Sequence, residues 1–206
     1  MVINPLQPQC PSVVTTDIPG GLADIYEASV NIAIWQRPAL DLSQAIFRDG
    51  FFPSIALNIE AEQVSAALEE QLPQFHLRRA LIDDVAWLSE MFACLFELDQ
   101  VGLRLTVLNK AMCPRFHVDH VPCRLLTNYV GPATEWLPER AVDRHCLGPL
   151  RAEMRPHTSA VQHLRNGDVA LIKGEGWIGN EGRGLVHRSP GVAEGESRLL
   201  LSLDFA

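Results

Sequence analysis

The pattern of apolar residues changes from helical to strand-like near residue 100. Apolar side chains recur at spacings of three and four along residues 81–98, namely at Leu81, Val85, Leu88, Phe92 and Leu95. This spacing predicts an amphipathic helix that buries one face. From Val101 to Leu108, apolar residues occupy every second position, which predicts a half-buried β-strand.

Further short strands are predicted after this point. The strand-like runs cover residues 116–119, 123–130, 161–164, 169–173 and 198–205. Asn166-Gly167 lies between two of them and is a hairpin-turn signal. In the last run, Arg198 shares one face with Leu200, Ser202 and Asp204, while leucines occupy the other face. We expect the leucine face to pack on a helix and Arg198 to face an interior pocket.

The first half of the chain gives weaker signals. Proline and glycine predict an irregular start of about twenty residues, residues 31–35 resemble a strand, and residues 41–48 and 58–72 resemble helices. Helices followed by many short strands predict an α+β protein. We expect a double-stranded β-helix (jelly roll) in residues 101–206, covered by the helical support region in residues 1–100, as one compact unit.

Composition and charge restrict the class of protein. The chain has 206 residues, of which 47% are hydrophobic and 20% charged, as in ordinary globular proteins. The formal net charge of −8 disfavours nucleic acid as a partner. There are five cysteines without disulfide-type spacing and no signal-peptide pattern, so we expect a cytoplasmic location. No apolar run is long enough to span a membrane.

The strongest chemical signal is His117-Val118-Asp119 with a distant His187. Side chains two apart on a strand share a face, so His117 and Asp119 can bind one ion together. Two imidazoles and one carboxylate are the ligand set of non-haem Fe(II) oxygenases. Arg198 could hold an acid cosubstrate through its guanidinium. The alternative is a pair of histidines with a structural role only.

Other patterns compete with this interpretation. Cys113, His117, His120 and Cys123 have a spacing that could hold structural zinc, although an extended segment sends the two histidines to opposite faces. Residues 174–184 contain five glycines, which predict either a mobile pocket rim or a disordered surface loop. Residues 138–165 look like an inserted excursion. Glu135-Trp136 is either a pocket wall or a buried indole beside a surface acid.

Several of these motifs, in this order, resemble known families. Phe116-His117-Val118-Asp119, the 124–129 strand, Gly131-Pro132-Ala133-Thr134-Glu135-Trp136, Gly167-Asp168, His187 and Arg198 resemble the core of prolyl-hydroxylase-like 2-oxoglutarate/Fe(II) dioxygenases. The whole chain also resembles a bacterial domain-of-unknown-function family (DUF1826), through Cys113-Pro-Arg-Phe-His-Val-Asp119, Gly131-Pro-Ala-Thr-Glu-Trp136 and His187-Arg-Ser-Pro190. Two positions depart from the dioxygenase pattern: Pro132 replaces a glycine, and Leu200 replaces a serine.

The dioxygenase resemblance implies a role for each matching residue. His117, Asp119 and His187 would be the catalytic metal ligands for Fe(II), with zinc as the less favoured metal. Arg198 would bind 2-oxoglutarate, and Tyr129 or Asn128 would hold the other end of that cosubstrate; neighbours on a strand face opposite ways, so at most one of them points inward. O2 would be activated while 2-oxoglutarate becomes succinate.

We therefore expect an oxygenase of the hydroxylase type that acts on a small-molecule or protein substrate. Two other classes of protein remain open: a metal-binding jelly roll without redox turnover, for sensing or handling metal, and a non-catalytic binding domain. One fold can host all three.

Overall fold

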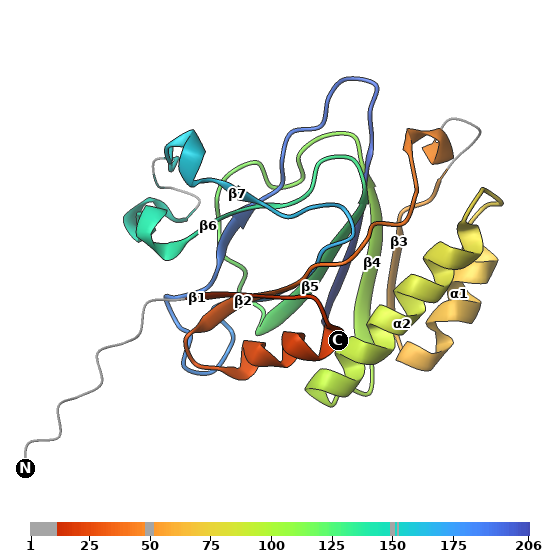
Figure 1. Cartoon of the computed structure of the whole chain (residues 1–206), viewed down its shortest axis with the longest axis horizontal. Helices are drawn as coiled ribbons and strands as arrows, with labels where there is room; N and C mark the ends of the chain where they lie inside the picture. The colour runs from red at the N-terminus through yellow and green to blue at the C-terminus, as the bar shows by residue number, and fades with distance from the viewer. Residues whose placement is uncertain (1–11, 48–51, 149–150, 152) are drawn as a thin grey trace, which may run out of the picture.

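The computed structural model describes residues 12–47, 52–148, 151 and 153–206. The predicted α+β class is confirmed in that the described chain is mostly sheet with few helices. Figure 1 shows α1 and α2 along one side of a large sheet, with β6 and β7 on the other side. Among the described residues, no helix is both long and apolar enough to cross a membrane.

The large sheet has seven strands in the order β1-β2-β8-β5-β10-β4-β3. The strands are β1 (Ser12–Thr16), β2 (Val30–Trp35), β3 (Ile55–Ile59), β4 (Val101–Leu108), β5 (Cys123–Val130), β8 (Val169–Lys173) and β10 (Arg198–Phe205). β1 pairs with β2 in parallel, and the other neighbours are antiparallel. The strands predicted at 31–35, 101–108, 123–130, 169–173 and 198–205 are confirmed.

A second sheet lies on the opposite side from the helices. It has three strands in the order β7-β6-β9, which are β6 (Glu135–Leu137), β7 (Gln162–His163) and β9 (Val186–Arg188). His117 adds one isolated bridge to His187 of β9. The strand predicted at 116–119 is therefore reduced to this single bridge, and the strand predicted at 161–164 to two residues.

A helix packs on the leucine face of the large sheet. This helix is α2 (Arg78–Phe96), and α1 (Val64–Gln71) packs beside it. Leu81, Leu88 and Phe92 of α2 belong to the same buried cluster as Leu201 and Leu203 of β10. α2 confirms the predicted helix at 81–98, although it begins three residues earlier. It ends where Glu97 adopts a left-handed conformation with φ 51°.

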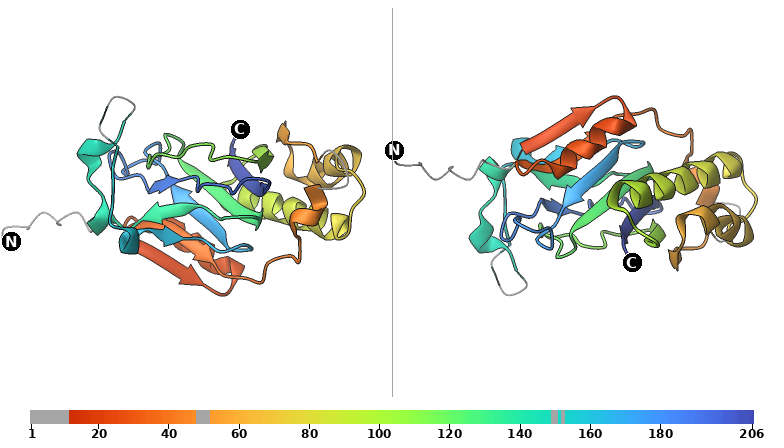
Figure 2. Two further views of the ribbon diagram at one scale, coloured as in Figure 1. Left: turned by 90° about the horizontal axis from the view of Figure 1, so that it is seen from above. Right: turned by 90° about the horizontal axis from the view of Figure 1, so that it is seen from below.

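Short 3₁₀ segments complete the first half of the chain and the excursion. They are η1 (Pro19–Tyr26), η2 (Gln44–Phe47), η3 (Ala61–Gln63), η4 (Glu139–Ala141), η5 (Arg144–Cys146) and η6 (Thr158–Ala160). The excursion packs on β6 and β9 through a small apolar cluster that includes Phe116, Leu137 and Val186. In both views of Figure 2 it lies at the opposite end of the molecule from α1.

Three predictions for the first half were wrong. Residues 12–16 form β1 rather than irregular chain, because they pair with β2. Asn58 lies in β3, which pairs with β4, and the helix starts only at Val64. The helix predicted at 41–48 is reduced to η2, and its last residue lies outside the described residues. The first half therefore supplies three strands of the large sheet in addition to its helices.

The hairpin predicted at Asn166-Gly167 was also wrong. β7 before this turn pairs with β6, whereas β8 after it pairs with β2 and β5. The turn therefore carries the chain from one sheet to the other. Gly167 has φ +89°, and a Cβ there would lie 2.6 Å from Cα of Ala39, so this position favours glycine both for conformation and for space.

Candidate metal centre

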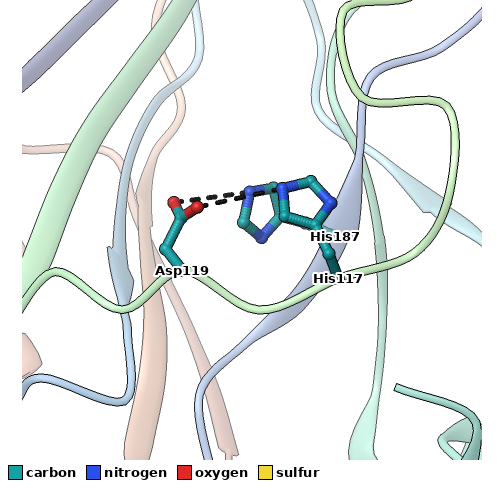
Figure 3. A group of neighbouring side chains, drawn as sticks. All are labelled: His117, Asp119 and His187. Atoms are coloured by element: carbon teal, nitrogen blue, oxygen red, sulfur yellow. Dashed lines mark ion pairs between the residues drawn. The ribbon is translucent and has the colours of Figure 1, made fainter. Parts of the chain in front are cut away.

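Two histidines that are 70 residues apart in sequence lie side by side. The N–H of His117 donates to the carbonyl oxygen of His187 at 3.0 Å, and the N–H of His187 donates back at 3.0 Å. The centroids of the two imidazole rings are 4.5 Å apart. This reciprocal backbone pair fixes both side chains on one face, as Figure 3 shows.

Asp119 completes the group from the segment just beyond His117. Its Oδ2 lies 3.6 Å from Nε2 of His187, and its Oδ1 lies 3.8 Å from Nε2 of His117. The candidate ligand atoms of all three residues lie within 4.8 Å of one another. Neighbouring ligands on an octahedral ion with bonds of about 2.1 Å are about 3 Å apart, so a small side-chain adjustment would suffice.

Both imidazoles turn Nε2 towards this group. Nδ1 of His117 lies 3.0 Å from the carbonyl oxygen of Arg115, and Nδ1 of His187 lies 3.2 Å from that of Leu185. A carbonyl only accepts, so Nδ1 carries a proton in both rings, and Nε2 is the nitrogen placed to bind a metal. Burial lowers the pKa of His187 to about 4, so this imidazole is neutral at neutral pH. A neutral imidazole is the form that binds a metal.

Arg124 holds Asp119 and was not identified from the sequence. Its Nη1 donates to Oδ2 of Asp119 at 2.7 Å, and its Nε donates to Oδ1 of Asp204 at 2.6 Å. The backbone N–H of Glu175 donates to the carbonyl oxygen of Asp119 at 2.8 Å. Side chain and backbone of Asp119 are therefore both anchored. The only available sequence signal was a charged residue inside the apolar β5 pattern.

Arg198 is a buried cation whose hydrogen bonds all go to neutral groups. It is 1% exposed. It donates from Nε to Oδ1 of Asn128 at 2.7 Å, from Nη1 to Oγ of Ser189 at 2.9 Å, and from Nη2 to Oγ1 of Thr134 at 2.7 Å. No carboxylate among the described residues forms an ion pair with it. Burial lowers the pKa of Arg198 to about 10, which still leaves it charged at neutral pH.

The structure separates the two neighbouring candidates for cosubstrate binding. Asn128 lies beside Arg198 and binds its Nε. Tyr129 is 2% exposed and belongs to the core on the helix side of the sheet, where its hydroxyl donates to Oδ2 of Asp84 at 2.6 Å. The structure therefore does not bring Tyr129 to the site, as expected for adjacent residues on one strand.

One cavity joins the histidines and the arginine. It has a volume of about 460 Å³ and is lined by His117, His187, Arg198, Thr134 and Ser189 together with the inward-facing residues of β4, β5 and β10. Leu200, Ser202 and Asp204 of β10 also line it, so the predicted inward face of this strand is confirmed. A cavity of this size suits a small molecule, because pockets that bind small molecules typically have volumes of about 300–1,000 Å³.

The competing zinc group does not assemble in the described part of the chain. Cys123 is fully buried in the helix-side core, whereas Cys113 is exposed. His120 is largely exposed and lies 3.4 Å from Glu175. Within the described residues, the set of possible metal ligands that comes together is His117, Asp119 and His187. The histidines of the excursion, His145, His157 and His163, do not join it.

Two further expectations are resolved by packing. Trp136 is buried in an apolar cluster, as the second alternative predicted. Glu135 is not the surface acid expected there, because its side chain is only 13% exposed and pairs with Arg188 at 2.5 Å. The glycine-rich segment is anchored rather than loose. Trp177 packs on Tyr26 and Phe96, and the amide of Asn180 donates to the carbonyl oxygen of Gly174 at 3.1 Å.

Comparisons with known proteins give one family and several distant structures. The model of the family described as "Protein of unknown function (DUF1826)" matches residues 16–204. No curated protein matches the sequence.

The solved structures similar to this chain include three oxygenases. The dioxygenase for auxin oxidation of rice has 14% identity and a TM-score of 0.49, with 96% of this chain and 83% of that chain covered. The corresponding enzyme of Arabidopsis thaliana, in complex with 2-oxoglutarate, has 10% identity and a TM-score of 0.45, with 95% and 92% covered. A 2OG-Fe(II) oxygenase family oxidoreductase of Burkholderia pseudomallei has 11% identity and a TM-score of 0.40, with 94% of each chain covered. Similarity at this level does not identify a reaction.

Proposed function

This chain belongs to the DUF1826 family, and we propose that it is an Fe(II)/2-oxoglutarate-dependent oxygenase of the hydroxylase type. The observation that carries the proposal is Arg198. A buried guanidinium without an acid partner is costly, because its charge has left water without compensation. A carboxylate bound in the cavity that Arg198 shares with the two histidines would supply the missing charge.

The strand order supports a double-stranded β-helix for this site. From β4 onward, the chain passes from the large sheet to His117 on the small sheet, back to β5, and then to β6 and β7 on the small sheet. It continues through β8, β9 and β10 on alternating sheets. Eight segments divided between two facing sheets, four on each, correspond to a jelly roll. The catalytic residues proposed here all belong to this part of the chain.

The donor set fits ferrous iron. Two imidazoles and one carboxylate lie close together, with both histidines lining an open cavity, and this set matches the facial triad of non-haem Fe(II) oxygenases. When bound, iron and 2-oxoglutarate would together supply O2 activation and oxidation of the substrate, with release of succinate and carbon dioxide. His117, Asp119 and His187 would hold the metal, and Arg124 would keep the carboxylate of Asp119 in position.

The rest of the site would position the cosubstrate. The guanidinium of Arg198 would bind its distal carboxylate, and the neutral partners Asn128, Ser189 and Thr134 already fix the direction of that guanidinium. Leu126 and Leu200 line the cavity with apolar surface, which limits access of water to the reacting groups.

The test compares Asp119→Ala with Asp17→Ala, a change at an exposed aspartate away from the cavity. With Fe(II), O2 and 2-oxoglutarate, we expect the wild type and Asp17→Ala to release succinate even without the primary substrate, at a slow uncoupled rate. Asp119→Ala should lose metal binding and all succinate release, because a ligand of the ion is removed. Calorimetry with Mn(II), followed by anaerobic titration with 2-oxoglutarate, separates the two losses.

The same measurements distinguish the other classes of protein. Tight metal binding, including Zn²⁺, without any binding of 2-oxoglutarate would indicate metal handling rather than oxygenation. Loss of folding stability in His117→Ala and His187→Ala, with no metal bound by the wild type, would indicate a structural role for the histidines. Either outcome would contradict the proposed oxygenase.

A further inference from the structure

The end of the cavity away from Arg198 contains a second group of charges. Asp204 accepts two hydrogen bonds from Arg124, at 2.6 Å from Nε and 3.0 Å from Nη2. It also accepts one from Nη1 of Arg104 at 2.7 Å. Arg104 lies on β4, directly opposite Ser202 of β10, and its side chain is 53% exposed. Asp204 is six residues from Arg198 on β10, about 20 Å along an extended strand.

The charge of the cavity is opposite to that of the whole protein. The chain has a formal net charge of −8. The charged side chains that line the cavity, among the described residues, are nevertheless four arginines and one aspartate, namely Arg104, Arg124, Arg188, Arg198 and Asp204. An acidic protein that concentrates arginine in a cleft attracts anions to that cleft.

Pairing these charges leaves one arginine in excess. Glu135 neutralises Arg188. Under the proposed function, the negative charges are the two carboxylates of 2-oxoglutarate and the carboxylate of Asp119. These three charges would balance the guanidinium of Arg198 and the two positive charges of the metal ion. The remaining group is Arg124, Arg104 and Asp204, with two positive charges and one negative charge. The net positive charge of these three side chains favours an anionic ligand.

Arg104 is the side chain in this group that remains available to a ligand. Arg124 already binds both oxygens of Asp204 and also reaches Asp119. Asp204 therefore does not need Arg104 for its own hydrogen bonding. Only Nη1 of Arg104 makes a hydrogen bond to a described side chain. The side chain is 53% exposed, and the residue lines the cavity as well as a second, smaller pocket against β3.

We propose that the primary substrate is a small molecule with an oxyanion, a carboxylate or a phosphate, that binds Arg104. This proposal rests on the proposed function. The substrate's anion would bind at Arg104, and its body would lie towards the metal centre. Leu126 and Leu200 line the cavity and offer apolar contacts to that body. The cavity volume of about 460 Å³ suits a small molecule beside the cosubstrate.

The test uses the full chain loaded with Mn(II), a paramagnetic stand-in for Fe(II), and saturated with 2-oxoglutarate. The probes are butyrate, butyl phosphate and 1-butanol, which share an apolar body and differ in the anion. Line broadening of the probe protons in NMR spectra reports both binding and closeness to Mn(II). We expect at least one of the two anions to bind about tenfold more tightly than butanol, and their order identifies carboxylate or phosphate.

The variants locate the anion. Arg104→Gln should weaken binding of the preferred anion about tenfold and leave that of butanol unchanged, whereas Arg104→Lys should retain part of the preference. Arg140→Gln is the matched control, because Arg140 is exposed and lies outside the cavity. Equal binding of anions and butanol, no binding of any probe, or an unchanged affinity in Arg104→Gln would overturn the proposal.

Failure of the proposed function gives a different result. In that case the wild type would not bind Mn(II) or 2-oxoglutarate in the first place, and the substrate proposal would fall with it. Normal binding of both, with no effect of Arg104→Gln on the probes, would contradict the anion site alone.

Discussion

The two faces of the large sheet each contain an arginine shielded from solvent, and only one of the two has an acid partner within the described chain. On the helix side, Arg37 donates to both oxygens of Asp84, at 2.5 Å from Nη1 and 2.7 Å from Nη2. The hydroxyl of Tyr129 donates to the same carboxylate at 2.6 Å. On the cavity side, Arg198 has only the neutral partners Asn128, Ser189 and Thr134.

This difference separates a structural arginine from one available to a ligand. The Arg37–Asp84 pair is complete within the chain. Arg37 also donates from Nε to the carbonyl oxygen of Gly167, so the pair ties α2 to the Asn166-Gly167 turn. Arg198 is oriented by three hydrogen bonds while its charge is left unbalanced. A group that is fixed before its ligand arrives binds that ligand without an ordering cost.

The largest effect is expected from Arg198→Met. Affinity for 2-oxoglutarate should fall at least about a hundredfold, because a charge-assisted contact with a carboxylate in a buried site is lost. Binding of Mn(II) should stay within about twofold of the wild type, and the melting temperature should change little, since the lost charge had no acid partner. Calorimetry measures the affinities for 2-oxoglutarate and Mn(II), and a thermal melt measures the melting temperature. A large fall in the melting temperature would mean that Arg198 is structural.

Arg37→Met should give the reverse result. Asp84 would stay buried without its cation, so the free energy of unfolding should fall by about 3 kcal/mol. Urea denaturation measures this loss. Affinity for 2-oxoglutarate in the folded protein should remain that of the wild type, because Asp84 and Arg37 lie on the other face. If the free energy of 2-oxoglutarate binding fell by more than the free energy of unfolding, Arg37 would contribute to the cosubstrate site. The contrast between the two faces would then be wrong.

Gly174→Ala tests the backbone support on the cavity side. A Cβ at this position would overlap the carbonyl oxygen of Val121 and would lie 2.7 Å from that of Asp119. The segment that carries Asp119 must then move, and we expect the affinity for Mn(II) to fall about tenfold. Gly191→Ala is the control, because nothing lies within 4 Å of a Cβ there. Equal metal affinities in the two variants would show that the loop does not position Asp119.

The smallest effect is expected from Tyr129→Phe. This change removes one hydrogen bond to Asp84 while Arg37 remains, so unfolding should become easier by about 1 kcal/mol. Titration with 2-oxoglutarate should give the wild-type affinity. A clear loss of that affinity would return Tyr129 to the cosubstrate site and contradict the placement described above.

Strands in which apolar and polar residues alternate could be predicted from the sequence, because one face of such a strand packs in the core and the other faces the cavity or solvent. β4 and β10 have this alternation, and their predicted bounds agree with the structure. β1 and β3 could not be predicted in the same way, because each is an outer strand of the sheet and depends on pairing with β2 or β4. Asn166-Gly167 predicted a turn, but the sequence did not tell which sheet each flanking strand joins.

The candidate site likewise has one part that the sequence indicated and another part that only the fold established. The sequence alone indicated His117, Asp119, His187 and Arg198, because residue types and a spacing of two are local properties. Only the tertiary structure brought His187 against His117, placed Arg124 on Asp119, and removed Tyr129 from the site. These contacts join residues from different strands and loops. Their distances follow from how the two sheets pack, which no local pattern of residues encodes.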